Sequence, residues 1–157
     1  MDRLFRQRME YVTSAHFEGC FLCTDAETDE LEANYILMRD DLCLVVMNRF
    51  PYNSGALLVA PRRHVGGLED LTVEERTGVM DLTVKAIEAL KDTMSPEGFN
   101  IGANLGAAGG AGVPGHMHMH VIPRWSGDTN FMPVVGDTKV LPETLEQSYA
   151  RLRPLFT

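Results

Sequence analysis

The sequence predicts an α+β fold: an antiparallel sheet of about five strands, with a central helix and a helix towards each end of the chain. Two observations predict this class. Several short apolar or alternating segments lie close enough in sequence to pair as hairpins. One long segment in the middle of the chain repeats its apolar residues with the period of an α-helix. The 157 residues suit a single domain, 1–157, with one sizeable core.

The strands are predicted from apolar runs that are bounded by turn residues. Residues 34–48 are expected to form two of them, with a bend at Asp40 and Asp41. Pro51 and Gly55 mark the next segment as a loop. The remaining strands are expected at 56–61, 98–104 and 116–124.

The central helix has the clearest signals. Thr72 and Glu75 fit a capping box at its start, and Ser95 and Pro96 end it. One face of this helix carries Met80, Val84, Ile87, Leu90 and Met94. A last helix is expected within 142–156, with an apolar stripe of Leu145, Tyr149, Leu152 and Phe156.

The two ends of the domain are expected to be less regular. Residues 1–32 would hold an N-terminal helix over the first dozen residues, followed by a segment with two cysteines. Within that segment EGCFLC, 18–23, is expected to be a turn, and the acidic residues 24–32 an exposed loop. Residues 126–157 would form a C-terminal tail and the last helix.

Charge and composition argue against several classes of function. The formal net charge is −8, so the surface as a whole does not attract nucleic acids or anionic membranes. The N-terminus lacks the pattern of a signal peptide, and no apolar run approaches the length that crosses a bilayer. Three cysteines, an odd number, favour a reducing, cytoplasmic setting.

The segment GHMHMHVIPRW, 115–125, contains three of the five histidines. Alternate side chains of a strand point to one face, so His116, His118 and His120 are expected to share a face. The residues expected on the other face, in the core, are Met117, Met119 and Val121. Burying imidazoles costs free energy unless each finds a partner. A neutral imidazole can attack phosphorus, and a second one can donate a proton to a phosphate oxygen or to the leaving group.

A glycine-rich loop directly precedes the histidines. GAAGGAGVPG, 106–115, holds five glycines in ten residues, so its backbone N–H groups could approach a bound anion closely. The pattern is no Walker loop, because no Gly-Lys-Ser/Thr follows, and no Rossmann loop, because it precedes a strand. Alone it is typical of a flexible connector; next to three histidines it favours phosphate binding.

The glycine-rich loop followed by HMHMHVIPRW resembles the His-x-His-x-His signature of the histidine triad (HIT) superfamily of nucleotidyl hydrolases and transferases. The resemblance covers most of the chain and includes CFLC, VVMNRFPYNSGALLVAPRRHVGGLEDLT and GFNIGAN. These blocks are similar to a branch that includes bacterial proteins like diadenosine tetraphosphate phosphorylases and hydrolases. The resemblance implies a HIT-like fold, a (di)nucleoside polyphosphate or nucleotide conjugate as substrate, and a homodimer with the central helix at the interface.

The resemblance also implies roles for single residues. His118 would be the nucleophile that attacks the α-phosphate, with its other ring nitrogen held by a backbone carbonyl. His120 would hydrogen-bond a phosphate oxygen. Asn48 would hold the ribose hydroxyls, and residues 33–48 would line the base pocket. The other residues expected to contact the nucleotide are Asn104, Gly112, Val113 and Trp125.

Two departures from the family pattern leave hydrolysis and phosphorolysis open. Many members carry Gln or Ser a few residues before the triad, where this chain has Gly112 and Val113, so that only backbone N–H groups could serve. Ala56 stands where His is frequent. Trp125 and the SGDTNF that follows it resemble the phosphorylase-like branch.

Cys20 and Cys23 have the spacing of half a zinc site. His64 and His116 would complete a tetrahedral set, and members of the superfamily with this cysteine pair are similar to the zinc-bearing ones. A structural zinc would then tie the N-terminal segment to the strand with the nucleophile. The alternative is a pair of buried thiols in an apolar cluster. His16 is a spare candidate ligand, but its position is more typical of a surface residue.

Other classes of function remain open from the sequence. One is a nucleotide-binding or regulatory HIT module with little turnover. Another is a cupin-like, metal-dependent oxygenase, which would need a carboxylate ligand, but none lies between Glu97 and Asp128. Arg124 could face the outgoing phosphate or lie at the surface, and Arg62 and Arg63 are expected at a solvated loop end.

Overall fold

The structure is a computed structural model that describes residues 19–113, 115–129 and 141–156. Five strands form one antiparallel sheet in the order β1-β2-β3-β5-β4. They are β1 (Ile36–Arg39), β2 (Cys43–Met47), β3 (Leu57–Pro61), β4 (Gly98–Ala103) and β5 (Met119–Arg124). This architecture confirms the predicted α+β fold. The predicted N-terminal helix and residues 130–140 of the predicted tail lie outside the described residues.

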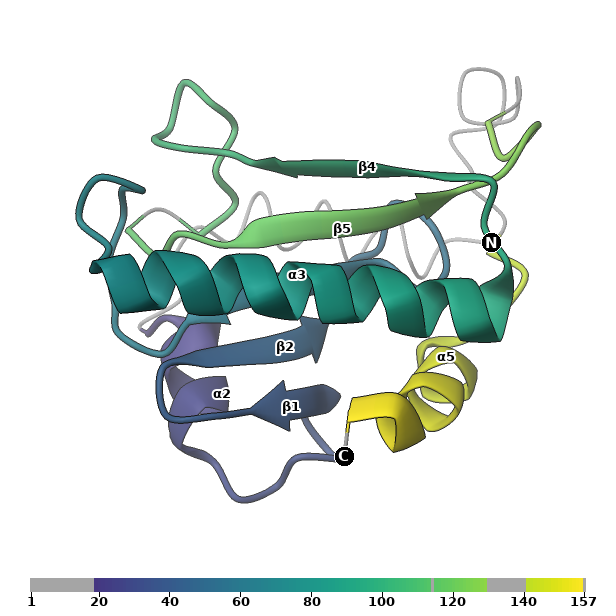
Figure 1. The fold of residues 1–157 in the computed structure, drawn as a ribbon, viewed down its shortest axis with the longest axis horizontal. Coiled ribbons are helices and arrows are strands. Elements are labelled where there is room, and N and C mark those ends of the chain that lie inside the picture. The colour runs from purple at the N-terminus through teal and green to yellow at the C-terminus, as the bar shows by residue number, and fades with distance from the viewer. Residues whose placement is uncertain (1–18, 114, 130–140, 157) are drawn as a thin grey trace.

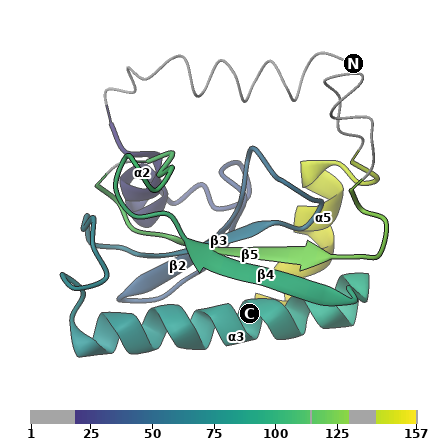
Figure 2. The same ribbon diagram turned by 90° about the horizontal axis from the view of Figure 1, so that it is seen from above.

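The sheet order places the histidine strand inside the sheet rather than at its edge. β5 lies between β3 and β4, and His120 pairs with Leu58 on one side and Gly102 on the other. The helix α3 (Val73–Met94) leads from β3 to β4 and crosses one face of the sheet, as Figures 1 and 2 show. The opposite face carries the helix α2 (Phe21–Glu27) over part of its width.

Two apolar clusters hold these layers together. In β2, Cys43, Val45 and Met47 pack in the cluster beneath α3, while Leu44 and Val46 belong to the cluster beneath α2. This alternation buries every residue of β2 and β3, because both faces of these strands are covered. The cluster beneath α2 draws its buried residues from α2, β1, β2 and β3. Side chains of β5 and β4 on that face are therefore left for the site described below.

The helix α3 begins and ends as the sequence predicts. The Thr72 side chain accepts a hydrogen bond from the Glu75 N–H, and the Glu75 carboxylate accepts one from the Thr72 N–H. Ser95 ends the helix in the left-handed conformation, directly before Pro96.

The expected apolar face of α3 is only partly a core face. Of its members Leu90 is buried, whereas Met80 and Val84 are 53% and 48% exposed. The buried residues are Glu75, Val79, Leu82, Thr83, Ala86, Ala89 and Leu90. Two apolar stripes thus run side by side on this helix, and the one with small alanines faces the sheet. In the other stripe Met80 and Val84 face outwards, whereas Ile87 and Met94 are partly buried against the core.

The segment around the cysteines differs from the expected turn and exposed loop. Cys20 precedes the first turn of α2, and residues 21–27 are helical. Leu22 and Ala26 are buried, and so is the Asp25 side chain. The helix forms despite its weak sequence signal because the sheet covers its apolar side, so tertiary packing outweighs local propensity.

The last helix agrees with the prediction. It consists of α5 (Leu145–Leu152) and a 3-10 turn η1 (Arg153–Phe156), with Tyr149, Leu152 and Phe156 buried. The Tyr149 hydroxyl donates to the Ile36 carbonyl at 3.1 Å, which joins this helix to β1. Among the described residues, no helix is both long enough and apolar enough to span a membrane.

Candidate functional site

The three histidines lie on the face of the sheet opposite α3, as alternation predicts. The β-ladder begins only at Met119, later than the expected 116, yet Met117 already packs in the core beneath α3. The Met117 N–H donates to the Val65 carbonyl at 2.6 Å, which keeps the extended course of this segment. His116 and His118 are therefore buried on the other side.

A backbone hydrogen bond orients His118. Its Nδ1 lies 2.9 Å from the carbonyl oxygen of His116. A carbonyl can only accept, so Nδ1 carries the proton and Nε2 keeps its lone pair. Burial lowers the pKa of His118 from its ordinary value, and the bond to the carbonyl opposes this in part. The ring is thus held neutral near pH 7, with Nε2 as its basic nitrogen.

His120 lies between His118 and a pocket. The ring centroids of His118 and His120 are 5.0 Å apart, and the Tyr52 ring stands edge-on to His120 at 6.2 Å. The pocket has a volume of about 280 Å³. It is lined by Tyr52, Asn100, Ile101, Gly102, Ala103, Asn104, His120 and Ile122.

The structure brings only some of the expected nucleotide contacts to this pocket. Asn104 follows β4 and lines it together with His120. Gly112 and Val113 belong to the glycine-rich loop, and Trp125 is half-buried just after β5. None of these three is among the pocket-lining residues, and neither is Asn48.

Asn48 follows β2 and begins the β2–β3 loop. Its side chain is buried, and its Oδ1 accepts a hydrogen bond from the Phe50 N–H at 3.0 Å. Its own N–H donates to the Ala56 carbonyl. These bonds fix the position of Asn48 at the end of the strand.

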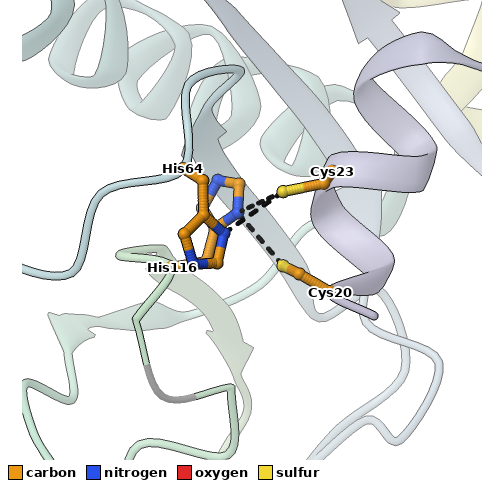
Figure 3. A group of neighbouring side chains, drawn as sticks. All are labelled: Cys20, Cys23, His64 and His116. Carbon is orange, nitrogen blue, oxygen red and sulfur yellow. Dashed lines mark hydrogen bonds between the residues drawn. The ribbon is translucent and has the colours of Figure 1, made fainter. Parts of the chain in front are cut away.

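Cys20, Cys23, His64 and His116 form a group that could hold a metal ion (Figure 3). Their ligand atoms all lie within 4.8 Å of one another. The Sγ atoms of Cys20 and Cys23 lie 3.1 and 3.4 Å from Nδ1 of His116, and Cys23 Sγ lies 3.2 Å from Nδ1 of His64. Around a tetrahedral zinc this separation is about 3.6 Å, so the four side chains fit an ion with shifts of a few tenths of an ångström.

The tautomer of His116 supports the same fit. Its Nε2 lies 2.8 Å from the Pro61 carbonyl and must therefore donate, which leaves the lone pair on Nδ1, beside the two thiols. Such a bond from the distant nitrogen to a carbonyl is the usual support of a metal-bound histidine. Burial and the neighbouring Cys20 raise the pKa of Cys23 to about 11, so a cation is what would favour its thiolate form.

A buried ion pair joins the cysteine helix to the loop of Asn48. The Arg49 guanidinium donates to both carboxylate oxygens of Asp25, at 2.7 and 3.0 Å, and to the Asn34 carbonyl at 3.1 Å. It also stacks over the Phe21 ring. Burial raises the pKa of Asp25, and Arg49 opposes this rise. Since Arg49 follows Asn48 directly, the position of that loop depends on α2.

A second network joins the same loop to the end of β5. The Asn53 amide donates to the Pro123 carbonyl at 3.0 Å and to the Asp128 carboxylate at 2.7 Å. Arg124 donates to both oxygens of Asp128 and holds the pKa of that carboxyl well below its usual range. Of the two roles open to Arg124, the structure thus favours a structural ion pair: Arg124 holds Asp128, which in turn accepts a hydrogen bond from Asn53, the residue after Tyr52.

Arg63 is exposed after the end of β3, as predicted, and it also has a structural partner. The Arg63 guanidinium donates to both oxygens of the buried Glu75 carboxylate, so it anchors the start of α3 rather than only lying at a solvated loop end. Arg62 pairs with the exposed Glu27 of α2.

The sequence did not reveal six of the eight pocket-lining residues, among them Tyr52, Asn100 and Gly102, or the ion pairs Asp25–Arg49 and Arg124–Asp128. Asn100 and Gly102 could have been found, because they alternate with Asn104 along one strand and so share its face. Tyr52 had no such signal, since it lies in an irregular loop. Asp25 was hidden because an acidic residue in an acidic run is normally solvated.

The HIT domain family matches residues 29–127, which include β1 to β5 and all three histidines of the segment 115–125. This chain belongs to the HIT domain family. Solved structures agree with its fold. A Zn-bound histidine triad family protein from Mycobacterium smegmatis has a TM-score of 0.69 at 24% identity, covering 87% of this chain and 92% of that one. A hypothetical histidine triad nucleotide-binding protein from Sulfolobus tokodaii has a TM-score of 0.68 at 21% identity, covering 87% and 91%.

Curated relatives of this HIT domain include named enzymes. A Mycobacterium tuberculosis protein named AP-4-A phosphorylase is 44% identical over 117 residues, which are 74% of this chain and 60% of that protein. The Schizosaccharomyces pombe bis(5'-nucleosyl)-tetraphosphatase (asymmetrical) is 34% identical over 121 residues, or 77% and 63%. The chain thus spans about 60% of the length of the curated relatives it matches first.

We predict that Asp25→Ala lowers the free energy of unfolding by about 2–3 kcal/mol, measured by urea denaturation. The substitution leaves the half-buried Arg49 without its carboxylate partner. Asp29→Ala is the matched control, because the Asp29 side chain is fully exposed and lies 3.8 Å from Arg39. Equal effects of the two substitutions would contradict a structural role for the Asp25–Arg49 pair.

Proposed function

We propose that this HIT domain is a nucleotide hydrolase or nucleotidyltransferase that acts on the α-phosphate of a dinucleoside polyphosphate or nucleotide conjugate. The observation that carries the proposal is the hydrogen bond from Nδ1 of His118 to the His116 carbonyl. It makes Nε2 the basic nitrogen of a buried, neutral imidazole, which is the form that attacks phosphorus. The names of the M. tuberculosis and S. pombe relatives support this substrate class.

The proposed reaction has two steps. In the first, the Nε2 lone pair of His118 forms a bond to the α-phosphorus while the bond from phosphorus to the bridging oxygen breaks. The electron pair leaves on that oxygen, and the shortened polyphosphate departs. In the second step, water or inorganic phosphate attacks the phosphorus and the N–P bond breaks, which restores His118. Water yields a nucleoside monophosphate and a proton, and phosphate yields a nucleoside diphosphate.

The remaining residues would bind and orient the nucleotide. His120, 5.0 Å from His118 between ring centroids, would hydrogen-bond a phosphate oxygen or assist the leaving group. Asn48 would hold the ribose hydroxyls through its amide N–H₂ group. Asn104 would face the phosphates, and so would the backbone N–H groups of Gly112 and Val113. Trp125 would lie at the edge of the site, as in the phosphorylase-like branch.

We also propose that Cys20, Cys23, His64 and His116 bind one structural zinc ion. Two thiols and two imidazoles are the donor set that tetrahedral zinc prefers, and zinc in such a closed site stabilises the fold without catalysing the reaction. The ion would join α2 to His116, two residues before the proposed nucleophile. A site with two thiol ligands needs reduced cysteines, which supports the predicted cytoplasmic setting.

The proposed assembly is a homodimer formed through α3 and β4. Met80 and Val84 are exposed on α3, and Ile101 of β4 is 43% exposed. Within the described part of the chain β4 ends the sheet, so its outer backbone groups could pair with a second copy. An apolar helix stripe beside a sheet edge fits an interface in which two sheets join.

We expect His118→Ala to lower turnover of diadenosine tetraphosphate at least roughly a thousandfold while nucleotide binding is retained, because only the nucleophile is removed. Turnover is measured by product chromatography and binding by calorimetry, with thermal unfolding as the check on the fold. A wild-type chain that binds nucleotides but turns none over would instead indicate the regulatory module.

Running the wild-type assay with and without inorganic phosphate separates the two acceptors, water and phosphate. A nucleoside diphosphate that forms only with phosphate means phosphorolysis.

The zinc proposal predicts about one zinc per chain in protein purified without chelator, measured by plasma mass spectrometry. Cys20→Ser is expected to lower that content strongly, since it removes one ligand. Cys43→Ala is the control, because Cys43 is buried beneath α3, away from the metal group, and its replacement should leave the zinc content unchanged. A folded, metal-free wild-type chain with intact thiols would rule the proposal out.

The dimer proposal predicts that Met80→Glu yields a monomer in gel filtration with light scattering, because a charge would be buried at the interface. Leu42→Glu serves as the control: Leu42 is an exposed apolar residue at the β1–β2 bend, outside α3 and β4. A wild-type chain that is strictly monomeric would contradict this part of the proposal.

A further inference from the structure

The pocket beside His120 includes the proposed phosphate contacts His120 and Asn104 but lies apart from the residues expected to hold the transferred nucleoside. It extends over β4 and β5, from His120 towards Ile122 and Asn100. Asn48, the proposed ribose contact, does not line it. His118 does not line it either. The pocket begins at His120, two residues after the proposed nucleophile. From this we infer that the pocket binds the nucleoside of the leaving group.

The lining favours a nucleobase over phosphates. The lining residues, all in the described part of the chain, include no lysine or arginine, and the neighbouring Arg124 guanidinium is bound to the Asn100 amide oxygen and to the Asp128 carboxylate. Phosphate groups are normally bound by cations or by clustered backbone N–H groups. Beyond the proposed phosphate contacts, Tyr52 offers an aromatic ring, which suits the flat face of a base, and Asn100 offers its amide N–H₂ group, which suits the hydrogen-bonding edge of a base. A volume of about 280 Å³ suits part of a ligand and not a whole dinucleotide.

The position of the pocket also agrees with the geometry of phosphoryl transfer. The attacking and leaving atoms must lie roughly in line on opposite sides of the phosphorus. With His118 as the attacking group, the leaving oxygen departs on the side away from His118. His120 borders both His118 and the pocket, so it can contact the phosphate while the departing nucleoside lies beyond it.

Gly102 makes this pocket possible. It pairs directly with His120, and a Cβ atom built on it meets nothing within 4 Å. A side chain at this position would occupy the pocket without displacing its neighbours. Gly98 lies four residues earlier on the same face of β4, and a Cβ atom built on it also meets nothing within 4 Å. Unlike Gly102, it does not line the pocket. The two glycines are therefore a matched pair for testing the pocket.

The test compares two substrates of the wild type and its variants. Diadenosine tetraphosphate has a leaving nucleoside, and adenosine phosphoramidate, whose leaving group is ammonia, has none. The measured quantity is the ratio of kcat/KM for the first substrate to kcat/KM for the second. Because the transferred group is the same in both, the ratio isolates interactions with the leaving group.

Tyr52→Ala is expected to lower this ratio by roughly tenfold, the usual effect of losing one base–aromatic stack. Gly102→Val should lower it as well, and Gly98→Val should leave it unchanged. If Tyr52→Ala and Gly102→Val reduce both substrates equally, the pocket serves the transferred nucleotide and the inference is wrong. An unchanged ratio in both variants would also overturn it.

The inference rests on the proposed function, and the two fail in different ways. If the wild type turns over neither substrate, the proposed activity fails, and the inference with it. If the wild type turns over both, the activity stands and the variants alone decide on the pocket. Gel filtration of Gly102→Val and Gly98→Val confirms that both variants keep the assembly of the wild type, since both positions lie in β4.

Discussion

Two hydrogen bonds from imidazole rings to backbone carbonyls give neighbouring histidines different chemistry. Nε2 of His116 donates to Pro61, and Nδ1 of His118 donates to His116. Because each carbonyl accepts, the two rings have opposite tautomers: the lone pair of His116 is on Nδ1, beside the thiols, and that of His118 is on Nε2. The His116 residue therefore connects both sites, with its ring at the metal group and its carbonyl on the nucleophile. A substitution that moves His116 would therefore affect both the metal group and the orientation of His118.

The rest of the fold keeps this segment and its surroundings in place. Methionines on the α3 side anchor the segment in the core, so the histidines have no freedom to exchange faces. Two polar networks then hold the β2–β3 loop from opposite sides, through Asp25–Arg49 at α2 and through Asn53–Asp128 at the end of β5. The loop carries Asn48 near one network and Tyr52 near the other. Residues distant in sequence thus converge around one face of the sheet.

The parts of the molecule that follow from local periodicity could be predicted from the sequence. Strand alternation predicted that His118 and Met117 lie on opposite faces of the sheet, and the capping box at Thr72 predicted the start of α3. Long-range packing could not be read in this way. The helix α2 forms because the sheet covers it, and Asp25 is buried because Arg49, 24 residues away, pairs with it. Nor could periodicity decide which of two apolar stripes of α3 faces the core. The pocket beside His120 depends on Tyr52, which reaches β5 through a loop whose course is set by tertiary contacts.

The central claim is that Nε2 of His118 becomes bonded to the nucleotide during turnover. The most direct measurement is mass spectrometry of the intact chain, mixed rapidly with diadenosine tetraphosphate and quenched in alkaline denaturant to preserve the acid-labile N–P bond. The expected result is a gain of one adenylyl group per chain, located by peptide mapping on His118. Product accumulating with no modified chain at any time, or an adduct on another residue, would contradict the account.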